Sequence, residues 1–471
     1  MMQKKTTFGI IVGSRNFFPA HLCREGRDTM LQVIAEEGCC AVCLGDADTR
    51  YGSVETLDDA LKAAELFKQH APDLDGFIIT LPNFGDERAA ANSIRYSGLN
   101  LPVLVHAYPD RRGKMDQDNR RDSYCGKMSV CNNLHQYGVP FTLTRKHTVD
   151  PTAESFRQDL RSFAATCRVV RGLRRARIGA LGARPAGFNT VRFSEKLLER
   201  SGIAVETLDL SEAFGRANSL ADDDPIVAEK RTSIEAYARV AAVPHEALTR
   251  MAKFGVVIDR WMVQSRLDAT AIQCWTSMEQ YFGAFPCTLM SMMSNKLIPA
   301  ACETDVVGAV GMYALALASG RPGALIDWNN NYEDEDDKGV IFHCSNLPAQ
   351  LLTDIPVMTH NPGVAADFGL EQSFGILSGR VKADPFTFLR ISTDDTGGRI
   401  QAYIGEGELT DDPLDTYGGY GVAHIERFQD LLQHICRNGF EHHVAITPAR
   451  VAPAVHEALT SYLEWETYYH R

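Results

Sequence analysis

The chain has 471 residues, of which 45% are hydrophobic and 23% are charged, and its formal net charge is −12. This length exceeds what one hydrophobic core supports and indicates two to four domains, whereas the composition is typical of a globular enzyme. The negative charge argues against nucleic acid or an anionic membrane as the main partner, and no apolar run is long enough to span a bilayer.

The N-terminal segment contains only a short apolar run before Gly13, too short for the core of a signal peptide. We therefore expect a cytoplasmic protein. The 12 cysteines are scattered, several of them in apolar segments, and none has the spacing of a zinc knuckle or ribbon. Without an export signal we interpret them as reduced thiols that fill the core, and we expect neither disulfides nor structural zinc.

Residues 1–170 alternate strand-like and helical segments. This alternation predicts an open, mostly parallel sheet with helices on both faces, in which ligands meet the loops at the carboxyl ends of the strands. One such loop, GSRNFFP, holds Arg15 and Asn16, which either bind substrate hydroxyls or cap the next helix. The loop has neither the GxGxxG fingerprint nor a P-loop lysine, so a nucleotide site is only weakly supported.

The same strand, loop, helix and strand pattern restarts near residue 171, which predicts a second doubly wound domain over 171–325. Its glycine-containing turn GALGARP lacks the later glycine of a dinucleotide fingerprint, and we interpret it as a structural turn. The strand-like run 268–277 places Gln273 and Trp275 two residues apart on one face. We interpret the methionines that follow as core residues.

Residues 326–471 consist of short strand-like runs separated by turn signals such as DTGG and GEG. This pattern is typical of an antiparallel barrel or sandwich. The final stretch, 452–470, predicts a helix on the outside of that domain.

Two carboxylates and a histidine lie at the ends of apolar runs. Glu303 precedes VVGAVGMYALALA, Asp327 follows GALI, and His343 follows VIF. Each acid has a structural explanation of its own, since a helix N-terminus favours Glu303 and a strand end accommodates Asp327. Buried carboxylates are costly without a compensating cation or donor, however. Together the three side chains indicate an oxygen-rich site for a divalent metal ion.

A pair of histidines, His442 and His443, precedes the strand-like run VAI near the end of the chain. Adjacent side chains on a strand face opposite sides. One of the two can therefore point to the site while the other supports it or meets solvent.

The segments CETDVVGA, DWNNNY, FHCSN and GFEHHVAI together resemble the L-fucose/L-arabinose isomerase superfamily, and in particular its fucose-isomerase-like branch, which includes sulfoquinovose isomerases. The resemblance extends from the GSRNFFP loop to the paired histidines. It implies an α/β protein with two Rossmann-like doubly wound domains followed by a C-terminal antiparallel β-barrel domain, in agreement with the pattern-based division into 1–170, 171–325 and 326–471.

The resemblance implies an aldose–ketose isomerase that transfers a proton through a cis-enediolate. By motif, a divalent metal ion of the Mn²⁺ type would be held by Glu303, Asp327 and His443, with His343 in the remaining position. The alternative assignment uses His442 in place of His443. Glu303 and Asp327 would also form the acid–base pair of the proton transfer, which suits their chemistry.

The resemblance also implies a homo-oligomer, either a trimer or a hexamer, whose active sites lie between subunits and bind a monosaccharide. The implied substrate-binding residues are Gln273, Trp275 and His442, and, from the neighbouring subunit, Arg15, Asn16, Asn83 and Phe84. Sulfoquinovose, fucose and arabinose-like sugars are the candidate substrates, and an arginine such as Arg15 suits the sulfonate of sulfoquinovose.

Two alternatives come from other functional classes. A non-catalytic sugar-binding or regulatory protein on the same fold would not need the acids and histidines together. A nucleotide-dependent oxidoreductase would need a complete glycine fingerprint, which neither candidate turn supplies.

Overall fold

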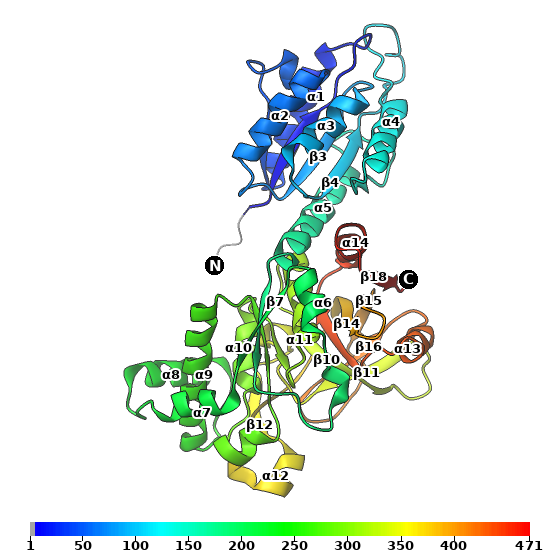
Figure 1. Cartoon of the computed structure of the whole chain (residues 1–471). Coiled ribbons are helices and arrows are strands. Elements are labelled where there is room, and N and C mark those ends of the chain that lie inside the picture. Colours follow the sequence, from blue (N-terminus) through cyan, green and yellow to red (C-terminus); the bar gives the residue numbers. More distant parts are fainter. Residues whose placement is uncertain (1–4) are drawn as a thin grey trace. The chain divides into compact units, whose positions relative to one another are not determined.

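The computed structural model describes residues 5–471 (Figure 1). The chain forms two compact units. Unit 1 contains the chain up to Arg171 together with Glu457–Glu464, and unit 2 contains Gly172–His456 and Trp465–Arg471. The predicted boundary at 325/326 stays a prediction, because it falls within unit 2. Among the described residues, no helix is both long and apolar enough to cross a membrane.

Unit 1 is built on a five-stranded parallel sheet with the strand order β2-β1-β3-β4-β5. Its strands are β1 (Thr7–Val12), β2 (Cys40–Cys43), β3 (Gly76–Leu81), β4 (Val103–Ala107) and β5 (Thr142–Leu143). Its helices are α1 (His21–Glu36), α2 (Leu57–Gln69), α3 (Glu87–Ser97), α4 (Ser123–Gln136) and α5 (Glu154–Leu173), the last of which continues into unit 2.

Alternation along β1 explains why helices cover both faces of this sheet. Phe8, Ile10 and Val12 pack with residues of α1 and α5, whereas Ile11 packs with residues of α2, α3 and α4. Successive strand residues point to opposite faces, so each face has its own hydrophobic core. The predicted parallel sheet with helices on both faces is confirmed.

The prediction of one helix over 452–470 is wrong in part. The structure has a short α14 (Ala452–Glu457), a turn of π-helix, and then a strand, β18 (Glu466–Tyr469), whose aromatic and threonine residues favour extended backbone. Within unit 1, the Tyr462 hydroxyl accepts a hydrogen bond from the Val103 amide at 3.3 Å and lies 3.2 Å from the Val103 carbonyl oxygen. The segment Glu457–Glu464 therefore belongs to unit 1 and packs on β4, not on the outside of the last domain.

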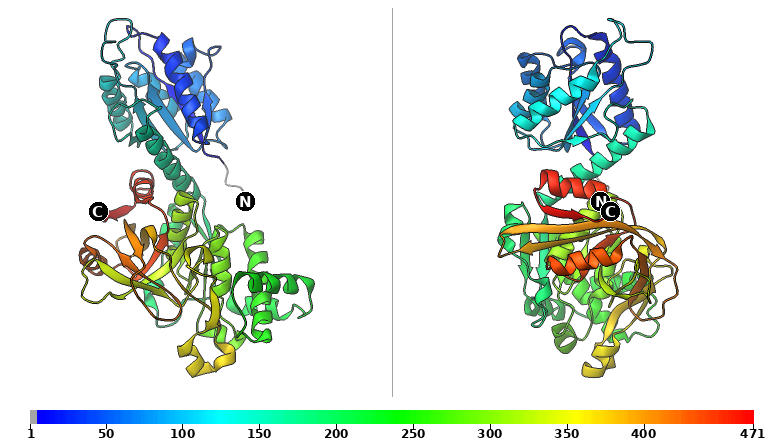
Figure 2. Two further views of the ribbon diagram at one scale, coloured as in Figure 1. Left: turned by 180° about the vertical axis from the view of Figure 1, so that it is seen from behind. Right: turned by 90° about the vertical axis from the view of Figure 1, so that its right-hand side faces the viewer.

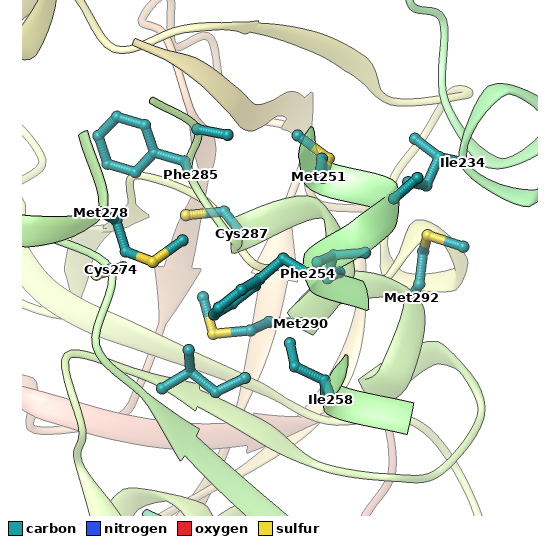
Figure 3. Close-up of a cluster of buried hydrophobic side chains, with 14 of the residues drawn as sticks. Ile234, Met251, Phe254, Ile258, Cys274, Met278, Phe285, Cys287, Met290 and Met292 are labelled. Carbon is teal, nitrogen blue, oxygen red and sulfur yellow. The ribbon is translucent and has the colours of Figure 1, made fainter. Parts of the chain in front are cut away.

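Unit 2 begins with a four-stranded parallel sheet in the order β7-β6-β8-β9. Its strands are β6 (Arg177–Leu181), β7 (Ala204–Leu208), β8 (Ala269–Ile272) and β9 (Ala300–Cys302). The helices are α6 (Glu195–Arg200), α7 (Leu210–Asn218), α8 (Pro225–Tyr237), α9 (His245–Ser265), α10 (Cys287–Asn295) and α11 (Val306–Ser319). The second predicted parallel sheet is confirmed, and Met290, Met292 and Met293 lie in its hydrophobic core, as predicted (Figure 3).

The rest of unit 2 is a nine-stranded mixed sheet in the order β12-β13-β16-β11-β10-β17-β14-β15-β18. The new strands are β10 (Ala324–Asn331), β11 (Lys338–His343), β12 (Val357–His360), β13 (Phe374–Arg380), β14 (Asp384–Asp394), β15 (Arg399–Thr410), β16 (Gly419–His424) and β17 (His443–Thr447), with helices α12 (Pro362–Phe368) and α13 (Phe428–Arg437). The long pair β14–β15 is orange in Figure 2.

An additional antiparallel pairing joins β15 to β16. The pairings therefore run from β16 through β11, β10, β17, β14 and β15 and return to β16. Most strand pairs of the nine-stranded sheet are antiparallel, as predicted for this part of the chain. The pairs β13–β16 and β15–β18 are parallel.

Candidate active site

The register of the central strand β10 brings two of the predicted residues together. Asp327 lies opposite Phe342 of β11 on one side and opposite His443 of β17 on the other. Directly opposite residues of an antiparallel pair share a face, and His443 Nε2 lies 3.5 Å from Asp327 Oδ1. The side chain of His443 is 1% exposed, whereas that of His442 is 43% exposed. The register thus points His443 inward.

Glu303 reaches the same place from the turn between β9 and α11. Glu303 and Thr304 have φ angles of 60° and 58°, in the left-handed region that costs a non-glycine residue about 1–2 kcal/mol. In this turn Glu303 Oε2 lies 3.0 Å from His443 Nε2, and Oε1 accepts a hydrogen bond from Trp275 Nε1 at 2.9 Å. The strained turn aims the carboxylate at the histidine.

The helix N-terminus next to Glu303 is capped by another acid. Asp305 is the N-cap residue of α11, and its side chain accepts a hydrogen bond from the Gly308 amide at 2.8 Å. The alternative in which Glu303 serves as the N-terminal carboxylate of that helix is therefore wrong, because Asp305 has this role.

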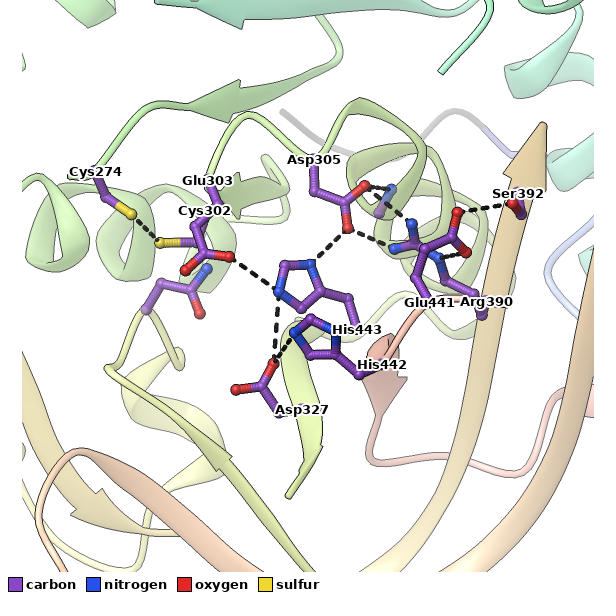
Figure 4. A network of polar contacts seen from close by, with 12 residues as sticks. Cys274, Cys302, Glu303, Asp305, Asp327, Arg390, Ser392, Glu441, His442 and His443 are labelled. Atoms are coloured by element: carbon purple, nitrogen blue, oxygen red, sulfur yellow. Dashed lines mark hydrogen bonds and ion pairs between the residues drawn. The ribbon is translucent and has the colours of Figure 1, made fainter. Parts of the chain in front are cut away.

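Asp305 also organises a buried network that the sequence did not reveal (Figure 4). Its carboxylate accepts hydrogen bonds from Arg390 at 2.5 and 3.3 Å and lies 2.9 Å from His443 Nδ1. Arg390 Nε donates to Glu441 at 2.9 Å, and the Ser392 hydroxyl donates to Glu441 at 2.8 Å. With Nδ1 held by Asp305, the Nε2 lone pair of neutral His443 faces the other two carboxylates.

These contacts shift the protonation of the site. Burial alone would lower the pKa of His443, but its hydrogen bond to Asp305 and the nearby Glu303 carboxylate raise that pKa to about 10. Burial alone would raise the pKa of Asp305, but Arg390 and His443 hold it well below its usual range. Burial likewise opposes ionisation of Glu303, and His443, His343 and Trp275 outweigh it, so the pKa of Glu303 is lowered.

His343 lies at the end of β11, with its ring centroid 5.7 Å from that of His443. Its Nδ1 accepts a hydrogen bond from the Cys344 amide at 3.0 Å. A neutral ring that accepts at Nδ1 has its proton on Nε2.

Three buried atoms of the site have no hydrogen-bond partner in the described part of the chain: Glu303 Oε2, Asp327 Oδ1 and His343 Nε2. Buried polar atoms normally have a partner. The ligand atoms of Glu303, His343 and His443 lie within 4.8 Å of one another, as do those of Asp327, His442 and His443. Carboxylate oxygens combined with imidazole suit a divalent ion such as Mn²⁺, so the residues fit the metal that the sequence implied.

Three further side chains border these groups. Gln273 Oε1 accepts a hydrogen bond from the Ala183 amide at 2.9 Å and so holds the loop after β6. From that loop, the Phe188 ring lies 5.7 Å from Trp275, 5.6 Å from His442 and 5.8 Å from His443, measured between centroids. Phe188 was not predicted, because its only signal in the sequence is an aromatic residue in the glycine-containing loop GARPAGFN.

The other predicted substrate-binding residues all belong to unit 1. The Arg15 guanidinium lies 4.6 Å from the centroid of the Phe84 ring and forms an ion pair with Glu87. Asn83 is fully buried, and its side-chain oxygen accepts hydrogen bonds from the amides of Arg15 at 3.3 Å and Gly85 at 3.1 Å. Asn83 therefore shapes the loop. Asn16 is exposed, and the role of these residues in substrate binding stays a prediction.

Two family models match the chain. The model described as Fucose/sulfoquinovose isomerase, N-terminal domain, matches residues 9–174, and the model described as L-fucose isomerase, C-terminal domain, matches residues 341–470. The chain belongs to the fucose and sulfoquinovose isomerase family. The family predicted from the sequence motifs is thereby confirmed.

Curated relatives of this family have similar lengths. The sulfoquinovose isomerase of Priestia aryabhattai is 24% identical over 378 residues, which are 79% of this chain and 80% of the relative. The sulfoquinovose isomerase of Alkalicoccus urumqiensis is 25% identical over 372 residues, 77% of this chain and 79% of the relative. These matches indicate an aldose–ketose isomerase and do not favour the non-catalytic alternative.

Proposed function

We propose that this protein is a metal-dependent isomerase that converts sulfoquinovose to the corresponding ketose through a cis-enediolate. The observation that supports a metal-dependent reaction most directly is the convergence on His443 Nε2 of Glu303 Oε2 at 3.0 Å and Asp327 Oδ1 at 3.5 Å. The choice of sugar is supported by the relatives, which are sulfoquinovose isomerases.

Glu303, Asp327 and His443 would hold the metal ion, which we take to be Mn²⁺. When bound, such an ion acts as a Lewis acid that stabilises negative charge on the two substrate oxygens. His443 suits this role because Asp305 occupies its Nδ1. His343 suits it less well, since its Nδ1 accepts the Cys344 amide hydrogen. We assign His343 instead as a donor, through Nε2–H, to a sugar oxygen.

The reaction moves a proton from C2 of the aldose to C1 while the carbonyl passes from C1 to C2. One carboxylate removes the C2 proton, which leaves the enediolate. The proton returns at C1, and the hydroxyl proton passes from O2 to O1. Glu303 and Asp327, each with a buried oxygen that lacks a hydrogen-bond partner in the described residues, are the acid–base pair of this scheme.

The remaining substrate contacts follow the predicted set. Gln273, Trp275 and His442 would bind sugar hydroxyls next to the metal site. Arg15, Asn16, Asn83 and Phe84 would come from a neighbouring copy in a homo-trimer or homo-hexamer, with the Arg15 guanidinium on the sulfonate. Arg15 is paired with Glu87 in this structure, so the sulfonate would replace that carboxylate. Light scattering of the purified protein tests the oligomer.

We further infer that the circuit of paired strands β16, β11, β10, β17, β14 and β15 is the predicted antiparallel barrel. The pairing of β15 with β16 supports this inference. Asp327 and His443 stand opposite each other on two strands of the circuit, so such a barrel would give the site a rigid wall.

The test of the proposal is an isomerisation assay on the full-length, metal-stripped protein, with and without added Mn²⁺, using sulfoquinovose, fucose and arabinose. We expect Mn²⁺ to restore turnover of sulfoquinovose and the Glu303→Gln and Asp327→Asn variants to stay inactive. Glu371→Gln, at an exposed position of unit 2, is the matched control and should behave as wild type. Preference for fucose or arabinose would refute the substrate, and full turnover without metal would refute the metal dependence.

A further inference from the structure

Four cysteines converge in unit 2. The sulfur atoms of Cys287, Cys302 and Cys344 lie within 4.8 Å of one another, and the Cys302 thiol donates a hydrogen bond to the Cys274 sulfur at 2.9 Å. Cys274, Cys287 and Cys302 are fully buried, and Cys344 is half-buried. The four residues follow β8, begin α10, end β9 and follow β11, respectively. No local spacing could have revealed a cluster built from four separate segments.

The surroundings of these thiols are rich in sulfur, and the Cys344 sulfur also lies 3.4 Å from His343 Nδ1. Cys274 and Cys287 lie among Met278, Met290 and other buried apolar side chains (Figure 3). The buried Glu279 interacts electrostatically with Cys344, and both of its carboxyl oxygens lack a hydrogen-bond partner in the described residues. An isolated buried thiol behaves as a small apolar group, but four together beside an unpartnered carboxyl group are more than core filling requires.

We propose that Cys274, Cys287, Cys302 and Cys344 form a second metal site, which binds a thiophilic ion of the Zn²⁺ class. Zinc–sulfur bonds of about 2.3 Å in a tetrahedral site place the sulfurs about 3.8 Å apart. Three of the sulfurs already lie within 4.8 Å of one another, and the fourth, that of Cys274, lies 2.9 Å from the Cys302 sulfur, so small side-chain movements would complete the site. Thiolates select zinc over manganese, whereas the carboxylates near His443 suit manganese. The bound cation would also supply positive charge near Glu279.

The cluster lies next in sequence to residues of the proposed sugar site and would hold them in position. Cys302 directly precedes Glu303, Cys344 directly follows His343, and Cys274 directly precedes Trp275. A metal ion that joins these thiols would fix the backbone beneath three residues of the proposed sugar site. The cysteines are thus positioning residues, and their loss should loosen the Mn²⁺ site without removing any of its ligands.

The experiment starts from the Mn²⁺-loaded, full-length protein after equilibration with Zn²⁺ and dialysis. We expect one equivalent of zinc in addition to manganese, with X-ray absorption at the zinc edge showing sulfur neighbours at about 2.3 Å. Titration with Cd²⁺ as a substitute should produce a thiolate-to-metal charge-transfer band. Cys287→Ser should lose both signals and bind Mn²⁺ about tenfold more weakly, while Cys167→Ser, a buried cysteine of unit 1, should keep both.

Three results would overturn this proposal. The first is the absence of retained zinc and of a charge-transfer band in the wild-type protein. The second is zinc that has only nitrogen and oxygen neighbours, which would place it in the site of His443. The third is an intact mass that shows a disulfide within the cluster in place of a metal ion. All three are measured on the wild-type protein, so they stand whether or not a variant folds.

Discussion

Nδ1 of His443 lies 2.9 Å from Oδ2 of Asp305, with both side chains excluded from solvent. The same carboxylate caps α11 and pairs with the buried Arg390. A single acid therefore caps the start of a helix, balances the charge of an arginine and orients a proposed metal ligand. Carboxylate partners of this kind tune ligand histidines in many metal sites.

The first prediction concerns this carboxylate. Asp305→Asn keeps an N-cap side chain but leaves Arg390 without its full counter-charge, and breaking a buried pair costs about 3–5 kcal/mol. We expect the free energy of unfolding to fall by that order and Mn²⁺ affinity to fall about 10–100-fold, as measured by denaturant unfolding and metal titration. Asp209→Asn, at the exposed N-cap of α7, should change stability by about 1 kcal/mol or less. Equal effects of the two substitutions would contradict the assigned role.

The second prediction concerns pH. The Asp305 and Glu303 carboxylates outweigh burial and raise the pKa of His443 to about 10, so at neutral pH a metal ion must displace a proton from the imidazole. Mn²⁺ affinity should therefore rise about tenfold per pH unit for each proton released, which calorimetry in buffers of different ionisation enthalpy can measure. Affinity that is constant between pH 6.5 and 8.5 would contradict this expectation.

The same shift has the opposite effect on the metal-free protein. Because the folded-state pKa of His443 lies above its ordinary value of 6.5, the stabilisation from protonated His443 is fully present below about pH 6.5 and is lost as the pH rises through about 10. Thermal unfolding of the stripped protein should show a Tm that falls over this range. A His443→Gln variant should lack that component of the pH dependence.

The third prediction concerns the indole that holds Glu303. Trp275→Phe removes the donor to Glu303 Oε1 and keeps an aromatic ring. Burial raises the pKa of Glu303, and this bond and the neighbouring His443 outweigh it, so loss of the bond should raise the pKa of Glu303. In Trp275→Phe the acid limb of the pH profile of kcat/KM should therefore move to higher pH. An acid limb at the same pH as in the wild type would contradict the role of this hydrogen bond in holding Glu303 ionised.

The fourth prediction concerns Phe188, whose ring packs against Trp275, His442 and His443. Removing an aromatic partner typically costs about 0.5–1.5 kcal/mol for each pair. We expect Phe188→Ala to lower kcat/KM about tenfold while Mn²⁺ affinity changes little, and Phe188→Tyr to retain most activity. Steady-state kinetics and metal titration separate the two effects, and a large loss of metal affinity in Phe188→Ala would show that the ring acts on the ligands instead.

Sequence patterns predicted both parallel sheets because buried strands and amphipathic helices leave strong local signals. Glu303 and Asp327 were predicted as site residues for a similar reason, since acids at the ends of apolar runs are conspicuous. The choice between His442 and His443 needed the register, because only the pairing of Asp327 with His443 shows which ring faces inward.

The partners of these residues left no such signal. Arg390 lies in the middle of β14, where a charged residue on a strand ordinarily points to solvent, and its partner Asp305 is 85 positions away in the chain. Phe188 likewise reaches the candidate site only through the packing of distant segments. The four cysteines are brought to one another in the same way. What the sequence could not supply was therefore the set of long-range contacts that orient the predicted groups.

The most direct test of the proposed mechanism is proton exchange with solvent. Sulfoquinovose should be converted in deuterium oxide by the Mn²⁺-loaded protein and the sugars followed by NMR. We predict deuterium at C1 of the ketose product and at C2 of the recovered aldose. This exchange should be abolished in Glu303→Gln and in Asp327→Asn, and Mn²⁺ should restore it in the metal-stripped wild-type protein. Exchange that persists in both variants, or that needs no metal ion, would contradict an isomerase centred on Glu303, Asp327 and His443.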